Sequence, residues 1–374
     1  MTASPVAVLS AERDLVVPTR QQRQEQVWLR CHTEEVRVTI GVDTHEDAHV
    51  AVALDQLGRW LGELAIPTTR RGYAQVLEWA SGFGVIDTFG VEGTGSWGAG
   101  LSRWLRAESL VVIEVDRPDR KTRRHGKSDT IDAEAAARAV LSGKATTVPK
   151  TGDGPVEMIR ILRMTRRSAV KNRTMTANQM SSLVATAPEA LRTQLRGLST
   201  GKRVALAVKF RTGEDLSNVL EATRYSLREL ARRYQHLSEQ IDRLDGQLDR
   251  LVADTAPDLL AKKGVGTHTA AALLVTAGDN PERLAHEGSF AHLTGSAPLD
   301  ASSGKQQRHR LNRGGDRDAN SALYLIALTR LATDEDTKLY MNRRLAEGKT
   351  KREVFRCLNR DPPMRFGLVD FVRR

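Results

Sequence analysis

The order of hydrophobic patterns between residues 36 and 140 constrains the fold more than any other feature of the sequence. Apolar residues alternate with polar ones at several places, as they do in strands, and elsewhere recur every three or four residues, as they do in helices. The strand-like segments are residues 36–42, 49–54, 61–66, 88–91 and 110–115. Helical segments lie between the third and fourth of these strands and between the fourth and fifth. The sequence therefore predicts an α/β domain whose sheet is partly parallel.

Three helices are predicted among these strands. The first carries Tyr73, Val76, Leu77 and Ala80, the second carries Trp97, Leu101, Trp104 and Leu105 on one face, and the third is the alanine-rich segment 128–140, which begins with a polar cap. The complete order is strand, strand, strand, helix, strand, helix, strand, helix. That order is typical of the ribonuclease-H-like fold.

Four acidic residues stand where this topology brings chain segments together. Asp43 ends the first strand, Glu92 ends the fourth, and Asp129 and Asp132 begin the helix after the fifth. Parallel strand ends meet at one sheet edge, and a spacing of three puts two carboxylates on one helical face. Such a set of oxygen ligands suits Mg²⁺, or Mn²⁺, and two-metal cleavage of phosphodiesters. Taken singly, each acid also has a plain explanation as a turn residue, a strand end, a helix cap or a first-turn charge.

Charge and composition narrow the class of protein. The chain has 374 residues, a net charge of +11 and a pI near 9.9, an excess that is common in proteins that bind nucleic acid. No apolar run approaches the roughly 18 residues of a membrane span, and the N-terminus has no signal-peptide pattern, so a cytoplasmic location without membrane contact is expected. Two distant cysteines exclude a disulfide framework or a cysteine-based zinc site.

Basic residues gather beside both predicted catalytic elements and are candidate nucleic-acid contacts. The first group is Arg117, Arg120, Lys121, Arg123, Arg124 and Lys127, and the second includes Lys305, Arg308, Arg310 and Arg313. Arg160, Arg163, Arg167 and Lys171 also recur at helical spacing, which favours a phosphate-facing helix surface.

A long helical region is predicted after residue 150. Apolar residues step alternately by three and four, the period of a coiled-coil seam, at Leu227, Leu230, Tyr234, Leu237, Ile241, Leu244, Leu248 and Leu251. The seam favours a homo-oligomer, a dimer or a tetramer, and the alternative is a long helix packed against its own chain.

The predicted organisation has five parts. They are a flexible extension (1–35), the catalytic α/β domain (36–150), a helical linker with coiled coil (151–256), a mostly α-helical C-terminal domain (257–360) and an atypical tail (361–374). Within the C-terminal domain, helices are expected at 267–277 and near 320–332, with a Gly/Ser-rich stretch at 302–304 between them.

Several short motifs, in this order, resemble those of the DEDD transposase family encoded by insertion sequences of the one-ten group. They are Gly41-Val42-Asp43-Thr44-His45, Val91-Glu92-Gly93-Thr94-Gly95, Lys127-Ser128-Asp129-Thr130-Ile131-Asp132-Ala133, Gly264-Val265-Gly266, Ala297-Pro298, Ser302-Ser303-Gly304-Lys305 and Asn312-Arg313-Gly314-Gly315-Asp316. The resemblance covers most of residues 36–357. It implies a resolvase-like (RuvC-like) N-terminal domain and a C-terminal transposase domain with a serine nucleophile.

The resemblance also implies roles for single residues. Asp43, Glu92, Asp129 and Asp132 are the implied metal ligands and catalytic acids, and Ser303 is the implied nucleophile, with Ser302 as the alternative. The implied partners are donor DNA, target DNA and an element-encoded structured RNA whose base pairing reads sequence. The catalytic site is implied to be shared between protomers.

Three other interpretations compete with this one. A metal-dependent junction nuclease would need the acids but no serine chemistry, and an inactive nucleic-acid-binding remnant would need neither. Gly93-Thr94-Gly95 alone also matches a nucleotide-binding loop, which is a weak signal. The tail after Arg360 departs from the family pattern at Asp361-Pro362-Pro363 and bears on activity rather than ancestry.

Overall fold

The structure is a computed structural model that describes residues 35–116, 128–211, 216–280, 287–304 and 309–358. It divides into two compact units, Met1–Thr147 and Val148–Arg374. The predicted extension, apart from residue 35, and the atypical tail lie outside the described residues.

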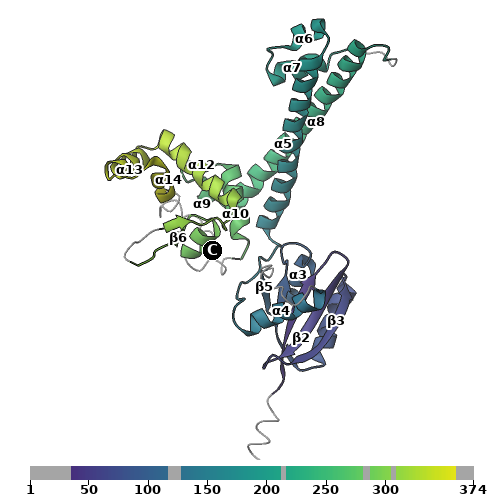
Figure 1. Ribbon diagram of the computed structural model, residues 1–374, viewed down its shortest axis with the longest axis vertical. Helices are drawn as coiled ribbons and strands as arrows, with labels where there is room; N and C mark the ends of the chain where they lie inside the picture. Colours follow the sequence, from purple (N-terminus) through teal and green to yellow (C-terminus); the bar gives the residue numbers. More distant parts are fainter. Residues whose placement is uncertain (1–34, 117–127, 212–215, 281–286, 305–308, 359–374) are drawn as a thin grey trace, which may run out of the picture. The chain divides into compact units, whose positions relative to one another are not determined.

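A five-stranded mixed sheet forms the centre of the first unit (Figure 1). Its strands are β1 (Arg37–Thr44), β2 (Ala48–Asp55), β3 (Trp60–Pro67), β4 (Val85–Glu92) and β5 (Val112–Val115). The order across the sheet is β3-β2-β1-β4-β5; the first three strands form an antiparallel meander, and β1, β4 and β5 run parallel. The predicted strands and the partly parallel sheet are confirmed.

Helices cover both faces of this sheet. They are α2 (Arg70–Ser81), α3 (Ala99–Ala107) and α4 (Asp129–Leu141). Apolar residues of α2 and α3 pack with Val38, Ile40 and Val42 on one face, whereas Ala133 and Ala137 of α4 pack with β2 on the other. The prediction that Trp97 shares a helical face with Leu101 and Leu105 was wrong, because Trp97 precedes α3 and its side chain is exposed.

Gly41 allows α4 to lie directly on the sheet. A Cβ atom at Gly41 would lie 2.0 Å from the backbone oxygen of Ala133 and 2.3 Å from the backbone nitrogen of Ala137. Backbone atoms cannot turn aside as a flexible side chain does, so any larger residue must push the helix from the strand. The same helix carries Asp129 and Asp132 at its start.

We therefore expect Gly41→Ala to destabilise the first unit by about 1–3 kcal/mol, the usual range for overpacking. All five tryptophans, at positions 28, 60, 79, 97 and 104, belong to this unit, so tryptophan fluorescence during urea unfolding follows it selectively. Gly95→Ala is the matched control, because nothing lies within 4 Å of its added Cβ. Equal stability of the two variants would contradict the close packing of α4.

His49 is a buried imidazole in β2, on the face covered by α2. Its ring stacks on Tyr73 with centroids 6.0 Å apart, and neither ring nitrogen has a hydrogen-bond partner in the described part of the chain. Burial lowers the pKa of His49 from its ordinary value of 6.5, because the charged form loses its hydration. Burial in the folded unit therefore favours the neutral form of this histidine.

This lowered pKa predicts a pH effect on stability. As pH falls below 6.5, the unfolded chain takes up a proton that folded His49 resists, so the free energy of unfolding should decrease between about pH 7.5 and 5.5. His49→Leu has no side chain that takes up this proton, so its free energy of unfolding should decrease less over the same pH range. Urea unfolding followed by tryptophan fluorescence at several pH values measures the difference, and parallel curves for the two proteins would contradict the prediction.

In the second unit, a long helical hairpin pairs α5 (Pro155–Thr186) with α8 (Val219–Thr255), and α6 (Glu189–Leu195) and α7 (Thr200–Ala207) close its far end (Figure 1). Arg166 pairs with Asp245, and Arg173 donates to Ser238 at 3.5 Å, so the two helices run antiparallel. The predicted seam of α8 is buried against this same chain, as Leu237 and Ile241 against Ala169 illustrate. Packing within the chain was the alternative interpretation of the seam, and a dimer stays a prediction.

The base of the hairpin shares a core with the C-terminal elements. These are α9 (Pro257–Leu260), α10 (Thr267–Ala277), α11 (Glu287–Leu293), β6 (Pro298–Asp300), β7 (His309–Leu311), α12 (Arg317–Thr333), α13 (Glu335–Ala346) and α14 (Lys351–Leu358). Ile159 of α5, Leu248 of α8, Leu273 of α10 and Ile326 of α12 belong to one buried cluster. Among the described residues, no helix has both the length and the apolar character needed to cross a membrane.

Candidate functional site

Two neighbouring parallel strands carry Asp43 and Glu92 to one edge of the sheet. Asp43 is the second-last residue of β1 and Glu92 is the last of β4, one position beyond the pairing of Val42 with Val91. Both residues are buried, each with 7% of its surface exposed. Gly41 and Gly90, two residues earlier in each strand, face the backbone of α4, so Asp43 and Glu92 lie on that side too.

The start of α4 supplies two more acids. Ser128 caps the helix by accepting a hydrogen bond from the backbone N–H of Ile131, and Asp129 and Asp132 occupy the first turn. Since Ser128 provides the cap, capping does not explain Asp129. Asp132 is buried at 8% exposure, whereas Asp129 is half-exposed.

His45 joins these acids, and sequence reasoning did not select it. Its Nε2 atom lies 3.1 Å from Oδ2 of Asp43 and 3.3 Å from Oδ1 of Asp129. Ligand atoms of these three residues lie within 4.8 Å of one another, which makes them a candidate metal site. Glu92 and Asp132 stand outside that set. The signal for His45 was its place in the Gly41–His45 motif, two residues after Asp43.

The charges at this edge influence one another. Burial raises the pKa of the Asp43 carboxyl above its ordinary 3.8; His45 opposes the rise, and the charges of Asp129 and Asp132 add to it. Carboxylates crowded in this way repel each other unless a cation lies among them. The donor set, mainly carboxylate oxygens with one imidazole, fits Mg²⁺ or Mn²⁺. Ligand atoms around one such ion are separated by at most about 4–5 Å, which agrees with the observed spread.

Ser303 lies in the second unit, on the loop that follows β6. Residues 301–304 are exposed, and Gly304 adopts a left-handed conformation with φ of 58°. The neighbouring Ser302 donates to Oδ1 of Asp300 at 3.3 Å, whereas the Ser303 side chain makes no hydrogen bond within the described residues. The β6–β7 pair that flanks this loop was not predicted from the sequence.

Few of the predicted basic contacts fall on described residues. Arg310 and Arg313 are exposed, on β7 and just after it. Outside the described residues lie Arg117, Arg120, Lys121, Arg123, Arg124, Lys127, Lys305 and Arg308. The predicted basic face of α5 is largely neutralised, because Arg160 pairs with Glu157, and Arg163 and Arg167 pair with Asp318.

Comparison with known proteins adds independent findings. Residues 40–187 match the family model of DEDD transposases of IS110 elements, and residues 257–342 match that of the IS116/IS110/IS902 transposase family. The transposase of insertion sequence element IS1328 from Yersinia enterocolitica is 30% identical over 245 residues, 64% of this chain and 67% of the relative. An uncharacterised 43.6 kDa protein of insertion element IS110 from Streptomyces coelicolor is 35% identical over 127 residues, 33% of this chain and 31% of the relative.

Proposed function

Because the chain belongs to the IS110/IS116/IS902 family of DEDD transposases, we propose that it cuts and rejoins DNA with an acidic metal centre and a serine nucleophile. The observation that carries this proposal is the cluster of Asp43, His45 and Asp129 at the sheet edge where β4 ends in Glu92. The sheet order, with α2 and α3 on one face and α4 on the other, supports a ribonuclease-H-like (RuvC-like) first unit.

The proposed metal ligands are Asp43, Glu92, Asp129 and Asp132, and His45 is a further candidate. A divalent cation, Mg²⁺ or Mn²⁺, would supply charge stabilisation to a phosphate undergoing displacement. The protein's own part is to hold the carboxylates ready. Burial fixes Asp43 and Glu92 on neighbouring strands, and the close contact of α4 with Gly41 fixes Asp129 and Asp132 opposite them.

Ser303 is the proposed nucleophile. Its Oγ would lose its proton and form a phosphoester bond to DNA while the bond from phosphorus to one deoxyribose oxygen breaks, and that leaving oxygen would take up a proton in exchange for the one that serine releases. The covalent ester conserves the energy of the broken linkage, so a new strand can be joined without ATP. Exposure of the loop and the conformational freedom of Gly304 support close approach of a DNA backbone.

The proposed partners follow from the family and the charge. A net charge of +11 suits donor and target DNA, and a structured RNA encoded beside the gene is proposed as the guide. We also propose a homo-oligomer, in which Ser303 of one protomer serves the acids of another.

Recombination of labelled donor and target DNA in Mg²⁺, with and without the RNA transcribed from the flanks of the element, tests the proposal. Joined product and a DNA-linked protein band that depend on both metal and RNA are expected. Joining that proceeds equally without the RNA would remove the guide from the proposal. Cutting without any joining or adduct would instead favour the metal-dependent junction nuclease.

A further inference from the structure

The far end of the α5–α8 hairpin is strongly basic. Residues 188–211, which include α6 and α7, contain six basic residues and a single acidic one, Glu189. The basic residues are Arg192, Arg196, Lys202, Arg203, Lys209 and Arg211. This end has its own core, formed by residues such as Met180, Leu191 and Leu227, so the helices that hold these side chains are fixed in place.

A pocket of about 460 Å³ lies between α5 and the α6–α7 end of the hairpin. Three arginines line it, Arg192, Arg196 and Arg203, together with the small residues Ser181 and Gly197. Like charges gathered around one cavity repel each other, and an anion in the cavity removes that repulsion. The residue types of the pocket therefore indicate a negatively charged ligand.

The pairing of these arginines supports the same conclusion. Arg192 pairs with Glu189, the one acidic residue of segment 188–211. That segment therefore has no other carboxylate to pair with Arg196 or Arg203. Among the described residues, Arg203 donates to two neutral oxygens, Oγ of Ser181 at 2.8 Å and the backbone oxygen of Leu198 at 3.2 Å, and its buried Nε finds no hydrogen-bond partner there. Arg196 is exposed and makes no ion pair among the described residues.

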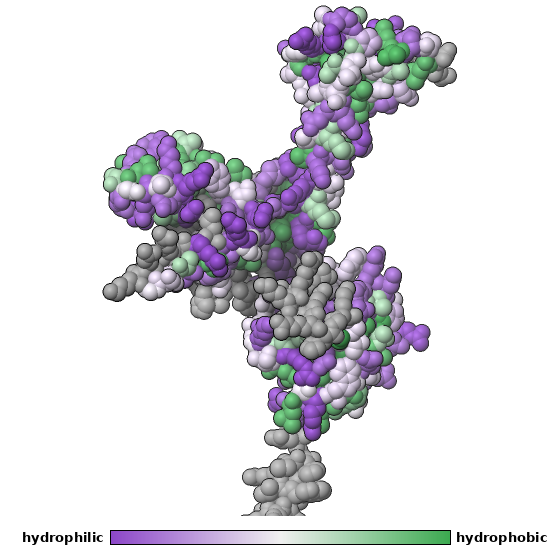
Figure 2. All heavy atoms as spheres, in the orientation of Figure 1, coloured by the Kyte–Doolittle hydropathy of each residue, from purple (hydrophilic) through white to green (hydrophobic). Residues whose placement is uncertain are grey.

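The arginines lower on α5 behave differently. Arg163 and Arg167 pair with Asp318, and Arg166 pairs with Asp245, so their charges are used to hold the second unit together. Hydrophilic side chains cover much of the visible face of the hairpin (Figure 2). Unlike these three arginines, Arg196 and Arg203 at the α6–α7 end form no ion pair among the described residues.

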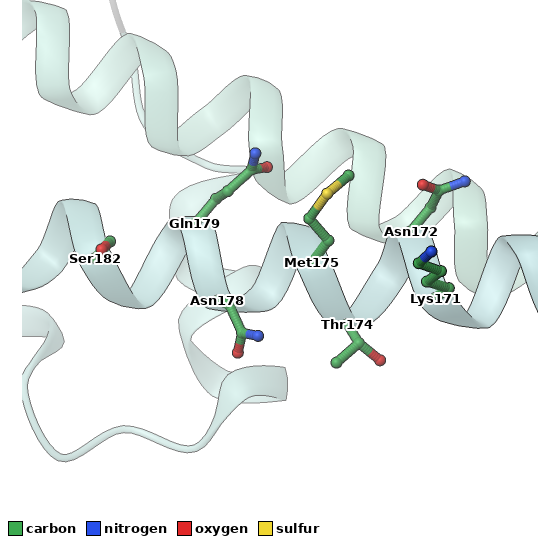
Figure 3. Close-up of a pocket in the computed structure, with 7 residues that line it drawn as sticks. All are labelled: Lys171, Asn172, Thr174, Met175, Asn178, Gln179 and Ser182. Carbon is green, nitrogen blue, oxygen red and sulfur yellow. The ribbon is translucent and has the colours of Figure 1, made fainter.

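A mixed face of α5 continues from the arginine pocket, with polar groups around one apolar side chain. A shallow pocket of about 650 Å³ there is lined by seven residues, which Figure 3 shows on successive turns: Lys171, Asn172, Thr174, Met175, Asn178, Gln179 and Ser182. Asn178, Ser182 and Ala185 follow at helical spacing, and Ala185 also lines the arginine pocket. At 1.5 Å per residue, the face from Lys171 to Ala185 is about 20 Å long.

We propose that this face and the arginine pocket bind the sugar-phosphate backbone of a nucleic acid, with one phosphate held by Arg192, Arg196 and Arg203. Amide, hydroxyl, lysine and arginine donors are the groups that contact phosphate and sugar in such complexes. A track about 20 Å long exceeds a single small anion and suits several consecutive nucleotides. The inference rests on the proposed function only in taking the ligand to be nucleic acid, DNA or RNA, and it is separate from the acidic site.

Fluorescence anisotropy of the full chain with labelled DNA and RNA duplexes of the same sequence tests this site. Arg196→Gln removes one charge from the pocket and keeps the backbone hydrogen bond that Arg196 makes at the end of α6. Arg233→Gln is the matched control, since Arg233 is an exposed arginine of the same hairpin outside the pocket. We expect Arg196→Gln to weaken binding about three- to tenfold and to reduce the slope of log affinity against log salt by about one, while the control changes affinity less than about twofold.

The two nucleic acids separate the sources of the phosphate. A loss confined to RNA assigns the track to RNA, a loss confined to DNA assigns it to DNA, and an equal loss assigns it to their shared backbone. If wild type binds but Arg196→Gln behaves as the control does, the site is overturned and the proposed function stands. If wild type binds neither duplex, both the site and the proposed function fail.

Discussion

Asp43→Asn is expected to reduce Mg²⁺-dependent DNA cleavage by roughly 10³-fold or more. A metal ion stabilises the charge of a phosphate displacement by several kcal/mol, and each 1.36 kcal/mol corresponds to about a tenfold change in rate. Asparagine keeps the volume of aspartate and retains an oxygen within reach of His45. The fold should therefore persist while the negative charge at the centre of the acidic site is lost.

The decisive comparison adds a metal-binding measurement to the cleavage assay. Mn²⁺ binding, followed by electron paramagnetic resonance, should weaken in Asp43→Asn and remain unchanged in Asp87→Asn. Asp87 is a suitable control because it is an exposed carboxylate of the same sheet that pairs with Arg37 at the surface. Cleavage that survives Asp43→Asn would place the reactive centre elsewhere in the chain.

The strands and the acids at their ends were predictable because burial imposes a period on the sequence. Val38, Ile40 and Val42 alternate along β1 since one face of the strand packs under α2 and α3. Once the strand ends are known, the topology dictates that Asp43 and Glu92 are neighbours. The places of Asp43 and Glu92 at the ends of predicted parallel strands were therefore enough to predict that they lie close together.

His45 and the β6–β7 pair were missed because no periodic pattern marks them. His45 follows the strand, in a segment that reads as a turn, and only its contacts with Asp43 and Asp129 reveal it. The strands β6 and β7 have three residues each, which is too short for an alternation of apolar and polar residues to be recognised. Short elements and single polar contacts depend on tertiary structure rather than on local sequence.

Long-range pairing explains the remaining differences. A spacing of three and four residues predicts that the seam of α8 is buried, but it does not say which helix buries it, and the partner is α5 of the same chain. Likewise, the basic spacing of α5 does not reveal that Asp318, some 150 residues away, neutralises Arg163 and Arg167. Without its partner, a charged helix face resembles a nucleic-acid surface.

Ser303→Ala is expected to abolish the covalent protein–DNA adduct and to reduce strand joining by roughly 10³-fold or more, as removal of a nucleophile does elsewhere. The side chain is exposed and forms no hydrogen bond among the described residues, so its loss should leave the fold and DNA affinity unchanged. Denaturing gels with labelled DNA detect the adduct, and anisotropy measures the affinity.

Ser302→Ala is the matched control for this prediction, one residue away on the same loop. Ser302 already donates to Asp300, so its hydroxyl is held by a carboxylate, whereas Ser303 stands next to Gly304 with its own hydroxyl available. Adduct retained by Ser302→Ala and lost in Ser303→Ala assigns the nucleophile, and the reverse pattern would move it to Ser302. If Ser303→Ala still cuts and joins while Asp43→Asn does neither, the acids work without a serine ester and the C-terminal unit serves another purpose.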